Sequence, residues 1–330
     1  MSSSPIPPAV VIAVSFNDGN YSPPSDSSQL STTTTPSTLS APAFLLAHPP
    51  GGYTALQTAG GPFRPVALAA HIRRLCETVR KIYFTDEKTN NDNDNETDGS
   101  TGVRVLREWS NEETAARPLV ELMQRAARAW VNADPARRNH TGFEVKITVL
   151  VALSKETGLI VAAHCDELHK RALSPTRVLV AGAPRVNPTA KGSQWVRTRA
   201  PLQAALTPPY TECILTDAAH NLYEGLTSNF CVLALPPDTT HDPYVACASA
   251  QYILMGTILQ IVIDGCKELG VTFRWQFPNV ADHSGASETA AVAAAGGKPV
   301  TPSSIWGGAF IASTTRGVLP IEEIAFPDGR

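Results

Sequence analysis

The 330-residue sequence lacks any run of about 18 apolar residues, the length that a membrane-spanning helix needs. It also lacks a basic excess: the formal net charge is −3, so the charge balance does not favour nucleic acid or an anionic membrane as a partner. The six cysteines are spread along the chain without a CxxC pair, which is typical of reduced, buried thiols rather than of a disulfide framework. We therefore expect no membrane or nucleic-acid partner and no metal site.

Basic residues are absent from the first 63 positions, where Asp18 and Asp26 are the charged residues; Arg64 is the first basic residue. An organelle transit peptide is rich in arginine and a secretory signal begins with basic residues, so neither fits. We therefore expect a cytoplasmic protein. With 43% apolar and 17% charged residues, the chain has enough apolar material for a sizeable core in one large or two ordinary domains.

The spacing of apolar residues predicts a mixed α/β fold with a domain boundary between 166 and 174. Residues 1–42 are expected to hold one strand, at 10–16, and then a flexible Ser/Thr/Pro-rich segment. Residues 43–170 form the expected small N-terminal α/β domain, and residues 175–330 the larger C-terminal one. In the small domain we expect two strands within 43–58, an amphipathic helix at 68–84, a polar loop insertion at 85–102, a helix within 113–133, and strands at 143–153 and 158–165.

The larger domain is expected to begin with a strand and to end with two strands joined by a hydroxyl-rich turn. A helix ending at Gly270, as a C-cap, is predicted within 252–270. The other expected elements are strands at 176–186, 211–217, 222–235, 244–250 and 271–277, a helix that opens within 191–206, and the closing pair of strands at 307–321.

One acidic residue, Glu224, interrupts an otherwise apolar stretch, "NLYEGLTSNFCVL", at 221–233. A carboxylate removed from water costs several kcal/mol unless a cation or hydrogen-bond donors compensate it. One interpretation is a hairpin turn with an exposed glutamate. The other is a buried Glu224 that faces a positively charged ligand atom, followed by the polar cluster Thr227, Ser228 and Asn229.

Three further features could carry chemistry. Lys191, in "NPTAKGSQWVRTR", is predicted in the first turn of a helix, where the dipole favours the neutral, nucleophilic amine; otherwise it is a surface lysine. Gly256, in "ILMGTILQ", precedes a helix whose first amides, of Thr257 and Ile258, suit a phosphate group, although an ordinary turn fits too. "STTRG", at 313–317, offers hydroxyl donors to a phosphate or is an exposed turn.

The order of these features resembles the class IV, or fold type IV, aminotransferases, which use pyridoxal phosphate and include branched-chain and D-amino-acid aminotransferases and aminodeoxychorismate lyase. Lys191 and Glu224 match the family's lysine and glutamate, "ILMGTIL" its phosphate loop, and "STTRGVLP" its late turn. Upstream, "GGYTALQT" and "HIRRL" resemble its strand and helix, in which Arg74 matches an arginine that contacts the cofactor phosphate. The resemblance covers about 45–85 and 175–325. The phosphate loop departs from the family pattern, with Ile258 and Leu259 at its usual Thr-Arg positions.

The resemblance implies a two-domain α/β fold type IV enzyme that moves an amino group between an amino acid and a 2-oxo acid. Lys191 would form the Schiff base with pyridoxal 5′-phosphate and then move the proton, while Glu224 would pair with the ring nitrogen. The cofactor-binding residues implied are Arg74, Lys191, Glu224, Ser228, Asn229, Gly256, Thr257, Ile258, Ser313 and Thr314.

For the substrate, the resemblance points to Tyr53, Thr315 and Arg316. The family often has an arginine on the strand that corresponds to 143–153, whereas this chain has only Lys146 there. Arg64, Arg73 and Arg316 are the alternative carboxylate ligands, so the amino-acid class and its D or L configuration stay open.

Two alternatives to an aminotransferase remain at this point. A lyase of the aminodeoxychorismate type would use the same residues but release pyruvate without a keto-acid acceptor. A pyridoxal phosphate-binding protein without turnover would use them for a regulatory or carrier role. The resemblance, and nothing else in the sequence, implies a homodimer.

Overall fold

The computed structural model describes residues 9–16, 32–84, 101–138, 142–154, 158–168, 175–236, 242–280 and 305–326. The chain divides into two compact units: unit 1 comprises Met1–Lys170 and Ala190–Thr198, and unit 2 comprises Arg171–Thr189 and Arg199–Arg330. Lys191 therefore belongs to unit 1, whereas the sequence-based division places it in the C-terminal domain.

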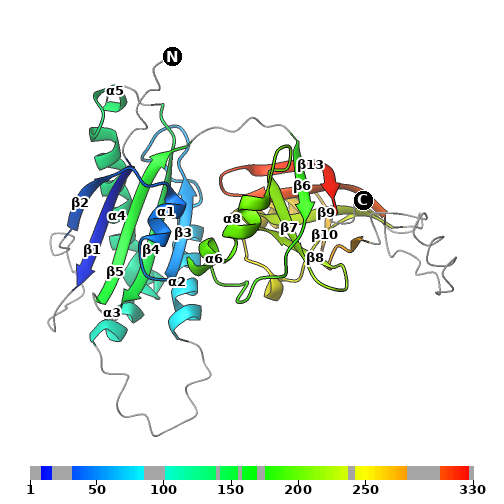
Figure 1. Cartoon of the computed structure of the whole chain (residues 1–330), viewed down its shortest axis with the longest axis horizontal. Helices are drawn as coiled ribbons and strands as arrows, with labels where there is room; N and C mark the ends of the chain where they lie inside the picture. The colour runs from blue at the N-terminus through cyan, green and yellow to red at the C-terminus, as the bar shows by residue number, and fades with distance from the viewer. Residues whose placement is uncertain are drawn as a thin grey trace, which may run out of the picture. The chain divides into compact units, whose positions relative to one another are not determined.

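Unit 1 is built on a five-stranded antiparallel sheet in the order β2-β1-β5-β4-β3 (Figure 1). Its strands are β1 (Ala9–Phe16), β2 (Thr32–Ser37), β3 (Gly51–Gln57), β4 (Val145–Ser154) and β5 (Gly158–Glu167). Side chains alternate between the two faces of a strand, so Val149 and Val151 of β4 join Val161 of β5 in one core beneath the helices. Tyr53 and Leu150 lie in a second, smaller core.

The helices of unit 1 are α1 (Ala41–Leu46), α2 (Leu68–Tyr83), α3 (Thr101–Trp109), α4 (Glu112–Asn132), α5 (Pro135–Arg138) and α6 (Gln194–Thr198). The helical spacing predicted over 68–84 is confirmed, because α2 buries Ile72, Leu75 and Val79 at that spacing and packs on β3. α4 packs on β1, β4 and β5.

Three elements of unit 1 differ from the sequence-based expectations. Thr32–Ser37, within the segment expected to be flexible, pairs with β1 as β2, since β-branched threonines favour strands; residues 17–31 lie outside the described residues. Residues 43–46 lie in helix α1 rather than in a strand, because Ser40 Oγ caps it at the Ala43 amide (3.4 Å) and Pro42 sits in its first turn. Thr101–Trp109 is helix α3, although 101–102 were expected in a loop; the rest of that insertion, 85–100, is not among the described residues.

Unit 2 contains an eight-stranded sheet in the order β11-β10-β9-β12-β13-β6-β7-β8. β8 also pairs with β9, so the strands from β9 to β8 close on themselves around a core that contains Val178, Phe230 and Ile311. The strands are β6 (Thr176–Val180), β7 (Glu212–Thr216), β8 (Leu222–Gly225), β9 (Asn229–Leu235), β10 (Tyr244–Cys247), β11 (Thr272–Trp275), β12 (Ile305–Ser313) and β13 (Gly317–Ala325).

The α-helices described in unit 2 are α7 (Ala200–Ala205) and α8 (Thr257–Glu268), of which α8 contributes to the site. Gly270, which follows α8, has a φ of +70°, as predicted for a C-cap glycine. The strand predicted over 222–235 is in fact two, β8 and β9, because a turn at 226–228 reverses the chain and brings Glu224 opposite Asn229.

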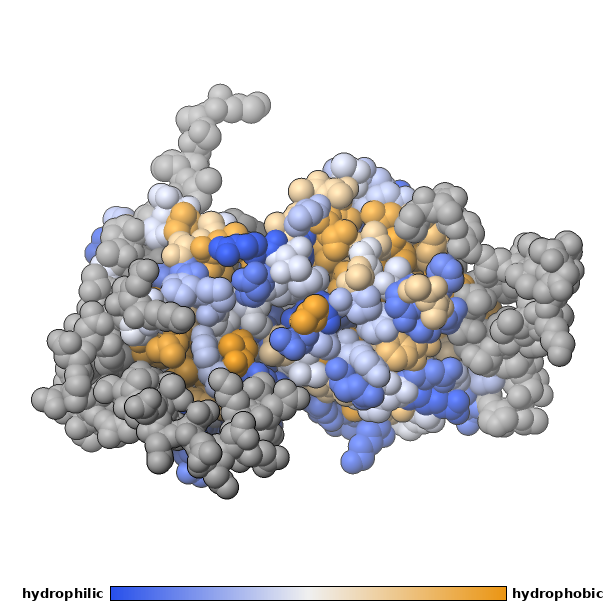
Figure 2. Space-filling model, turned by 60° about the horizontal axis from the view of Figure 1, so that its bottom comes forward, coloured by the Kyte–Doolittle hydropathy of each residue, from blue (hydrophilic) through white to orange (hydrophobic). Residues whose placement is uncertain are grey.

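Figure 2 shows one face of the molecule, on which apolar side chains occur in small groups between polar ones. Scattered apolar side chains of this kind are normal on protein surfaces. Across the described ranges, no helix is both long enough and apolar enough to span a membrane.

Candidate active site

In unit 1, the segment that carries Lys191 pairs with the free edge of β3. The amide of Tyr53 donates to the Lys191 carbonyl (3.0 Å), and the amide of Lys191 donates to Thr78 Oγ1 (3.2 Å). Gly52 and Gly192 form a β-bridge. Lys191 therefore precedes α6, which begins at Gln194, and does not lie in its first turn. The predicted helix-dipole effect on its amine does not apply at this position, because the dipole acts within the first turn.

Lys191 and Tyr53, two of the predicted site residues, lie together in unit 1. The Lys191 ammonium nitrogen, Nζ, is 4.9 Å from the centroid of the Tyr53 ring. Tyr53 is 6% exposed and packs in the smaller core of this unit, so its ring has a fixed position. A cation at this distance from an aromatic face is attracted by the ring quadrupole.

Arg74 lies in a buried polar cluster with two neutral side chains, Thr54 and His71. Its Nη2 donates to Thr54 Oγ1 (3.1 Å) and to His71 Nδ1 (3.1 Å), and Thr54 Oγ1 is 2.9 Å from His71 Nδ1. A guanidinium only donates, so His71 Nδ1 accepts and the ring proton is on Nε2. The Thr54 hydroxyl then donates to the same nitrogen.

Burial lowers the pKa values of both titratable groups in this cluster. Burial, and then Arg74 and Lys191, lower the pKa of His71 to about 3, so the imidazole is neutral near pH 7. Burial lowers the pKa of Arg74 to about 10, which leaves it charged. Arg74 Nε is buried and has no hydrogen-bond partner among the residues that the structure describes. This cluster therefore holds a buried cation whose Nε–H has no acceptor among the described residues.

In unit 2, Glu224 is 3% exposed, so the interpretation as a hairpin turn with an exposed glutamate is wrong. A cation does face the carboxylate: Arg185 Nη1 lies 3.2 Å from Glu224 Oε1. The Leu254 amide donates to Oε2 (3.0 Å). Arg185 was not predicted as a site residue, since no local pattern links it to a glutamate 39 residues later in the chain.

The N-terminus of α8 is joined to Glu224 through Leu254 and Asn229. Asn229 Nδ2 donates to the Leu254 carbonyl (2.7 Å), next to the amide that binds Glu224. A Cβ at Gly256 would lie 2.2 Å from Asn229 Oδ1, so a larger residue here would displace the Asn229 side chain. Thr257 is 6% exposed, and its Oγ1 has no hydrogen-bond partner among the described residues. Ile258, also predicted to bind phosphate, is the second residue of α8.

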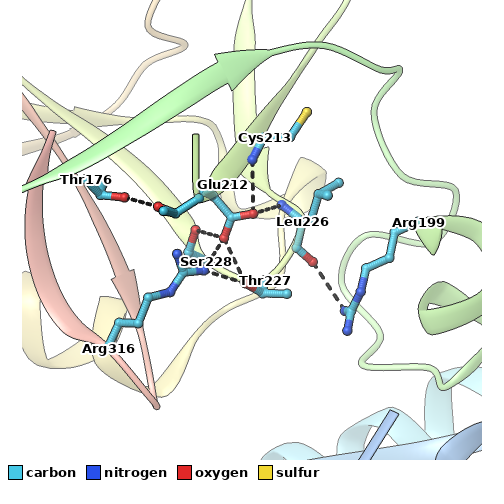
Figure 3. A network of polar contacts seen from close by, with 9 residues as sticks. Thr176, Arg199, Glu212, Cys213, Leu226, Thr227, Ser228 and Arg316 are labelled. Atoms are coloured by element: carbon cyan, nitrogen blue, oxygen red, sulfur yellow. Dashed lines mark hydrogen bonds and ion pairs between the residues drawn. The ribbon is translucent and has the colours of Figure 1, made fainter. Parts of the chain in front are cut away.

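Ser228 and Arg316 meet at a carboxylate that the sequence reasoning missed, Glu212 (Figure 3). Thr227 Oγ1 and Ser228 Oγ donate to Glu212 Oε2 (2.8 and 2.9 Å), and Arg316 Nη2 contacts the same oxygen. Glu212 is 2% exposed. The signal that singled out Glu224, a carboxylate beside an apolar run, is also present in "ECILT".

The turn after β12 contains the remaining candidates. The Arg316 amide donates to the Ser313 carbonyl (3.3 Å), and Gly317 closes the turn with a φ of +67°. Ser313 Oγ is buried, without a hydrogen-bond partner in the described part of the chain. Thr314 is half-buried and Thr315 is exposed.

The other basic residues considered for the substrate carboxylate are less enclosed. Arg73 lies 3.4 Å from Glu112 in an ion pair and is 61% exposed. Arg64 is exposed and Lys146 is half-buried on β4.

A family model described as "Amino-transferase class IV" matches residues 53–324. The chain belongs to the class IV aminotransferases. Membership confirms the family, the enzyme class and the cofactor, pyridoxal phosphate, that the resemblance implied. No curated protein matches this sequence.

Solved structures show the same fold at low sequence identity. A fold IV-transaminase from Curtobacterium pusillum has a TM-score of 0.60 at 17% identity and covers 98% of this chain and 93% of that one. A hypothetical aminotransferase from Mycobacterium tuberculosis in its PLP-bound form has 0.58 at 14%, covering 97% and 92%. A branched-chain aminotransferase from Thermoproteus uzoniensis, with norvaline, has 0.55 at 15%, covering 90% and 86%. The predicted fold type IV class is thereby confirmed.

Within this class IV aminotransferase, the predicted site residues form groups within each unit. Unit 1 brings Lys191 together with Tyr53, and both lie close enough to the buried cluster of Arg74 and His71 to influence its charges. Unit 2 joins Glu224, Asn229 and Gly256, and it joins Ser228 with Arg316 through Glu212.

Proposed function

We propose that this aminotransferase moves an amino group between an amino acid and a 2-oxo acid, with pyridoxal phosphate attached to Lys191. The observation that carries the proposal is the segment 254–257 of unit 2. At one end of it the Leu254 amide binds the Glu224 carboxylate, and at the other end Gly256 and Thr257 open helix α8. The segment therefore holds a carboxylate at one end and presents a helix N-terminus, which favours anions, at the other. This arrangement suits a cofactor that has a ring nitrogen at one end and a phosphate at the other.

Unsatisfied donors support a phosphate at the start of α8. No side chain caps this helix, and the buried Thr257 hydroxyl has no partner among the described residues. A buried hydroxyl without a partner costs about 1–3 kcal/mol, which a bound acceptor recovers. The Thr257 and Ile258 amides and Thr257 Oγ1 are therefore the proposed phosphate ligands here, and Thr257 supplies the hydroxyl that Ile258 and Leu259 lack.

The cluster around Arg74 supports an anion ligand in unit 1. Arg74 is 9% exposed, its described partners are the neutral Thr54 and His71, and its Nε is unpartnered among the described residues. A buried cation held by neutral groups is stabilised by an anion, and a guanidinium binds phosphate through paired N–H groups. Arg74 is therefore proposed as a phosphate ligand, as the resemblance implied.

Glu224 is a buried carboxylate whose two oxygens are held by different donors, Oε1 by Arg185 and Oε2 by the Leu254 amide. Arg185 offsets the cost of burying the negative charge. We assign Glu224 to the ring nitrogen, which it would keep protonated.

Bound pyridoxal phosphate would supply the electron sink for the carbanion at the substrate Cα. Lys191 would supply the attachment point and, through Nζ, carry the proton away from and back to the substrate. The backbone of Lys191 is held by β3 and by Thr78, and the Tyr53 ring lies beside Nζ. These contacts limit the positions that the Lys191 amine can reach. Tyr53 and Thr315 are retained as proposed substrate-facing residues, whereas the contact between Arg316 and Glu212 argues against Arg316 as the carboxylate ligand.

The first test is the visible absorption of the purified protein with pyridoxal phosphate, followed by D- and L-amino acids added singly. We expect a band of lysine-bound cofactor that is lost with one class of amino acid and restored by a 2-oxo acid. Release of pyruvate without an acceptor would instead identify the lyase, and a band that no amino acid changes would favour the binding protein.

The matched variants are Lys191→Ala and Lys267→Ala, the second being an exposed lysine in the last turn of α8. Lys191→Ala should abolish the band and Lys267→Ala should leave it unchanged. A normal band in Lys191→Ala would refute the assignment of Lys191.

We also propose a homodimer, as the resemblance implied, which sedimentation velocity would test.

A further inference from the structure

We propose that Glu212 is a positioning residue, which anchors the turn at 313–317 to the turn at 225–228 and thereby places Ser313 and Thr314 for the cofactor phosphate. The inference rests on the proposed function and deepens it. It concerns a residue that neither the sequence motifs nor the family match assigns to the site.

The Glu212 carboxylate has donors on both oxygens (Figure 3). Oε1 accepts from the Cys213 amide (3.2 Å) and the Leu226 amide (3.1 Å). Oε2 accepts from Thr227 Oγ1, Ser228 Oγ and Arg316 Nη2. At 2% exposure Glu212 is sealed from water, so these donors replace its hydration.

The turn at 225–228 closes tightly around this carboxylate. A Cβ at Gly225 would lie 2.4 Å from Ser228 Oγ and 3.0 Å from the Glu212 Cδ atom, so a larger residue would displace Ser228 or the Glu212 carboxylate. The Gly225 amide donates to the Ser228 carbonyl (2.8 Å), which completes the turn. Glu224, just before this turn, is held independently by Arg185 and Leu254. The turn at 225–228 is therefore a fixed support.

The turn at 313–317 follows Ala312, which pairs with Asn229 at the end of the support, and the Arg316 side chain adds a second link to it. Its guanidinium contacts both Glu212 and Thr227, while its backbone amide closes the turn at the Ser313 carbonyl. Strand pairing fixes the base of this turn, with Ser313 opposite Gly317, and the guanidinium fixes the side of the turn that faces Glu212. Since Ser313 Oγ is buried without a partner among the described residues, it is a donor available to a phosphate.

A purely structural ion pair would behave differently. Replacing a buried ion pair with neutral groups of similar size is often neutral for stability. If Glu212 positions the turn, such a replacement would spare folding but weaken binding of the phosphate group specifically. Affinity for pyridoxal phosphate, compared with affinity for pyridoxal, which has no phosphate, therefore separates the two roles.

The test variant is the double substitution Glu212→Gln/Arg316→Leu, which removes both charges together. We expect its affinity for pyridoxal phosphate to fall about 10- to 100-fold, as for the loss of one or more charge-assisted hydrogen bonds. Affinity for pyridoxal should change less than about threefold, within the range of a lost neutral contact. The melting temperature of the protein without cofactor should stay close to that of the wild type.

The matched control is Arg177→Leu/Glu322→Gln, which removes an exposed ion pair between β6 and β13. It should leave both affinities unchanged. Glu212→Asp, which keeps the charge on a shorter side chain, should recover part of the preference for pyridoxal phosphate over pyridoxal.

An unchanged preference for the phosphorylated compound in the double variant would overturn the proposal. Equal losses for both compounds, together with a lower melting temperature, would assign Glu212 a structural role only and would also overturn it. Failure of the wild type itself to bind pyridoxal phosphate would refute the proposed function, and this outcome is distinct because it appears before any substitution.

Discussion

Arg74 in unit 1 and Arg316 in unit 2 are both buried arginines, yet they have opposite kinds of partner. Arg74 donates to Thr54 and His71, which are neutral, and lies in no ion pair among the described residues. Arg316 contacts Glu212, a carboxylate that is 2% exposed. The charge of Arg316 is therefore paired directly with a carboxylate, whereas Arg74 has Glu77 only as a nearby charge and no ion pair among the described residues.

The difference indicates what each arginine is for. A buried arginine that is already paired with a carboxylate contributes to the internal structure. Its removal leaves that carboxylate buried without a counter-charge, which is destabilising. A buried charge without one is stabilised when an anion binds. By this reasoning Arg74 is a ligand-binding residue and Arg316 is a supporting one, although both belong to motifs that resemble the family.

The largest expected effect is the loss of stability in Arg316→Leu. This substitution leaves Glu212 buried without a cation, and breaking a buried pair in this way costs about 3–5 kcal/mol. Urea denaturation of the protein without cofactor should show the loss, and adding Glu212→Gln to the same chain should recover most of it. A loss of less than about 1 kcal/mol would mean that the ion pair of Arg316 contributes no more to stability than an exposed pair does, and the contrast with Arg74 would not hold.

Arg74→Leu should produce the reverse pattern. Affinity for pyridoxal phosphate should fall about 100-fold, because two charge-assisted hydrogen bonds to the phosphate would be lost. The free energy of unfolding without cofactor should decrease less than in Arg316→Leu, since only hydrogen bonds to neutral groups are lost and no buried carboxylate is left without its ion-pair partner. Titration with cofactor and urea denaturation measure the two quantities.

The neighbouring residue provides the control for this experiment. Arg73→Leu removes an arginine from the same helix, but Arg73 is 61% exposed and pairs with Glu112 at the surface. Its cofactor affinity should equal that of the wild type. If Arg73→Leu weakened binding as much as Arg74→Leu, the contrast between buried and exposed arginines would not hold.

A smaller effect tests whether the partner of Arg74 is neutral. The ordinary pKa of histidine is 6.5, and that of His71 is lowered in the folded protein to about 3, first by burial and then by Arg74 and Lys191. Between these values the unfolded chain binds a proton that the folded protein does not, so stability falls as the pH falls from 6.5 towards 3. The slope from this residue is at most about 1.4 kcal/mol per pH unit.

His71→Asn keeps an acceptor near the position of Nδ1 but cannot be protonated in this range. The difference in unfolding free energy between wild type and His71→Asn should therefore change with pH below 6.5 and stay constant above it. Parallel stability curves from pH 7 to pH 4 would show that His71 is not held neutral.

The smallest effect is expected for Glu322→Gln. Arg177 and Glu322 form an ion pair whose side chains are 41% and 44% exposed. Solvent screens such pairs, so the melting temperature should change by no more than about 1 °C. A large change in melting temperature would indicate that the presence of an ion pair, and not its burial, explains why Arg316 contributes more to stability than Arg74.

Much of the site was accessible from the sequence because its signals are local. The spacing of apolar residues in α2 predicted the helix that carries Arg74 on its buried side. The apolar residues around Glu224 predicted a buried carboxylate that faces a positively charged ligand atom; its burial is confirmed, and the described cation beside it is Arg185. Lys191 was placed in a helix because "SQWVRTR" has helical character, but pairing with the edge of β3 keeps it outside α6. That pairing joins segments far apart in the chain, so no local pattern could indicate it.

The sequence by itself indicated many of the helices and strands, though not α1, β2 or the turn between β8 and β9, and it shows two carboxylates beside apolar runs. These properties depend on side-chain periodicity and on turn residues, which act over a few positions. Only the tertiary structure decided that Arg185 faces Glu224, 39 residues away, and that Arg316 faces Glu212, 104 residues away. The partner of a buried charge is chosen by which strands and turns meet in space, and that choice leaves no trace in the spacing of residues along the chain.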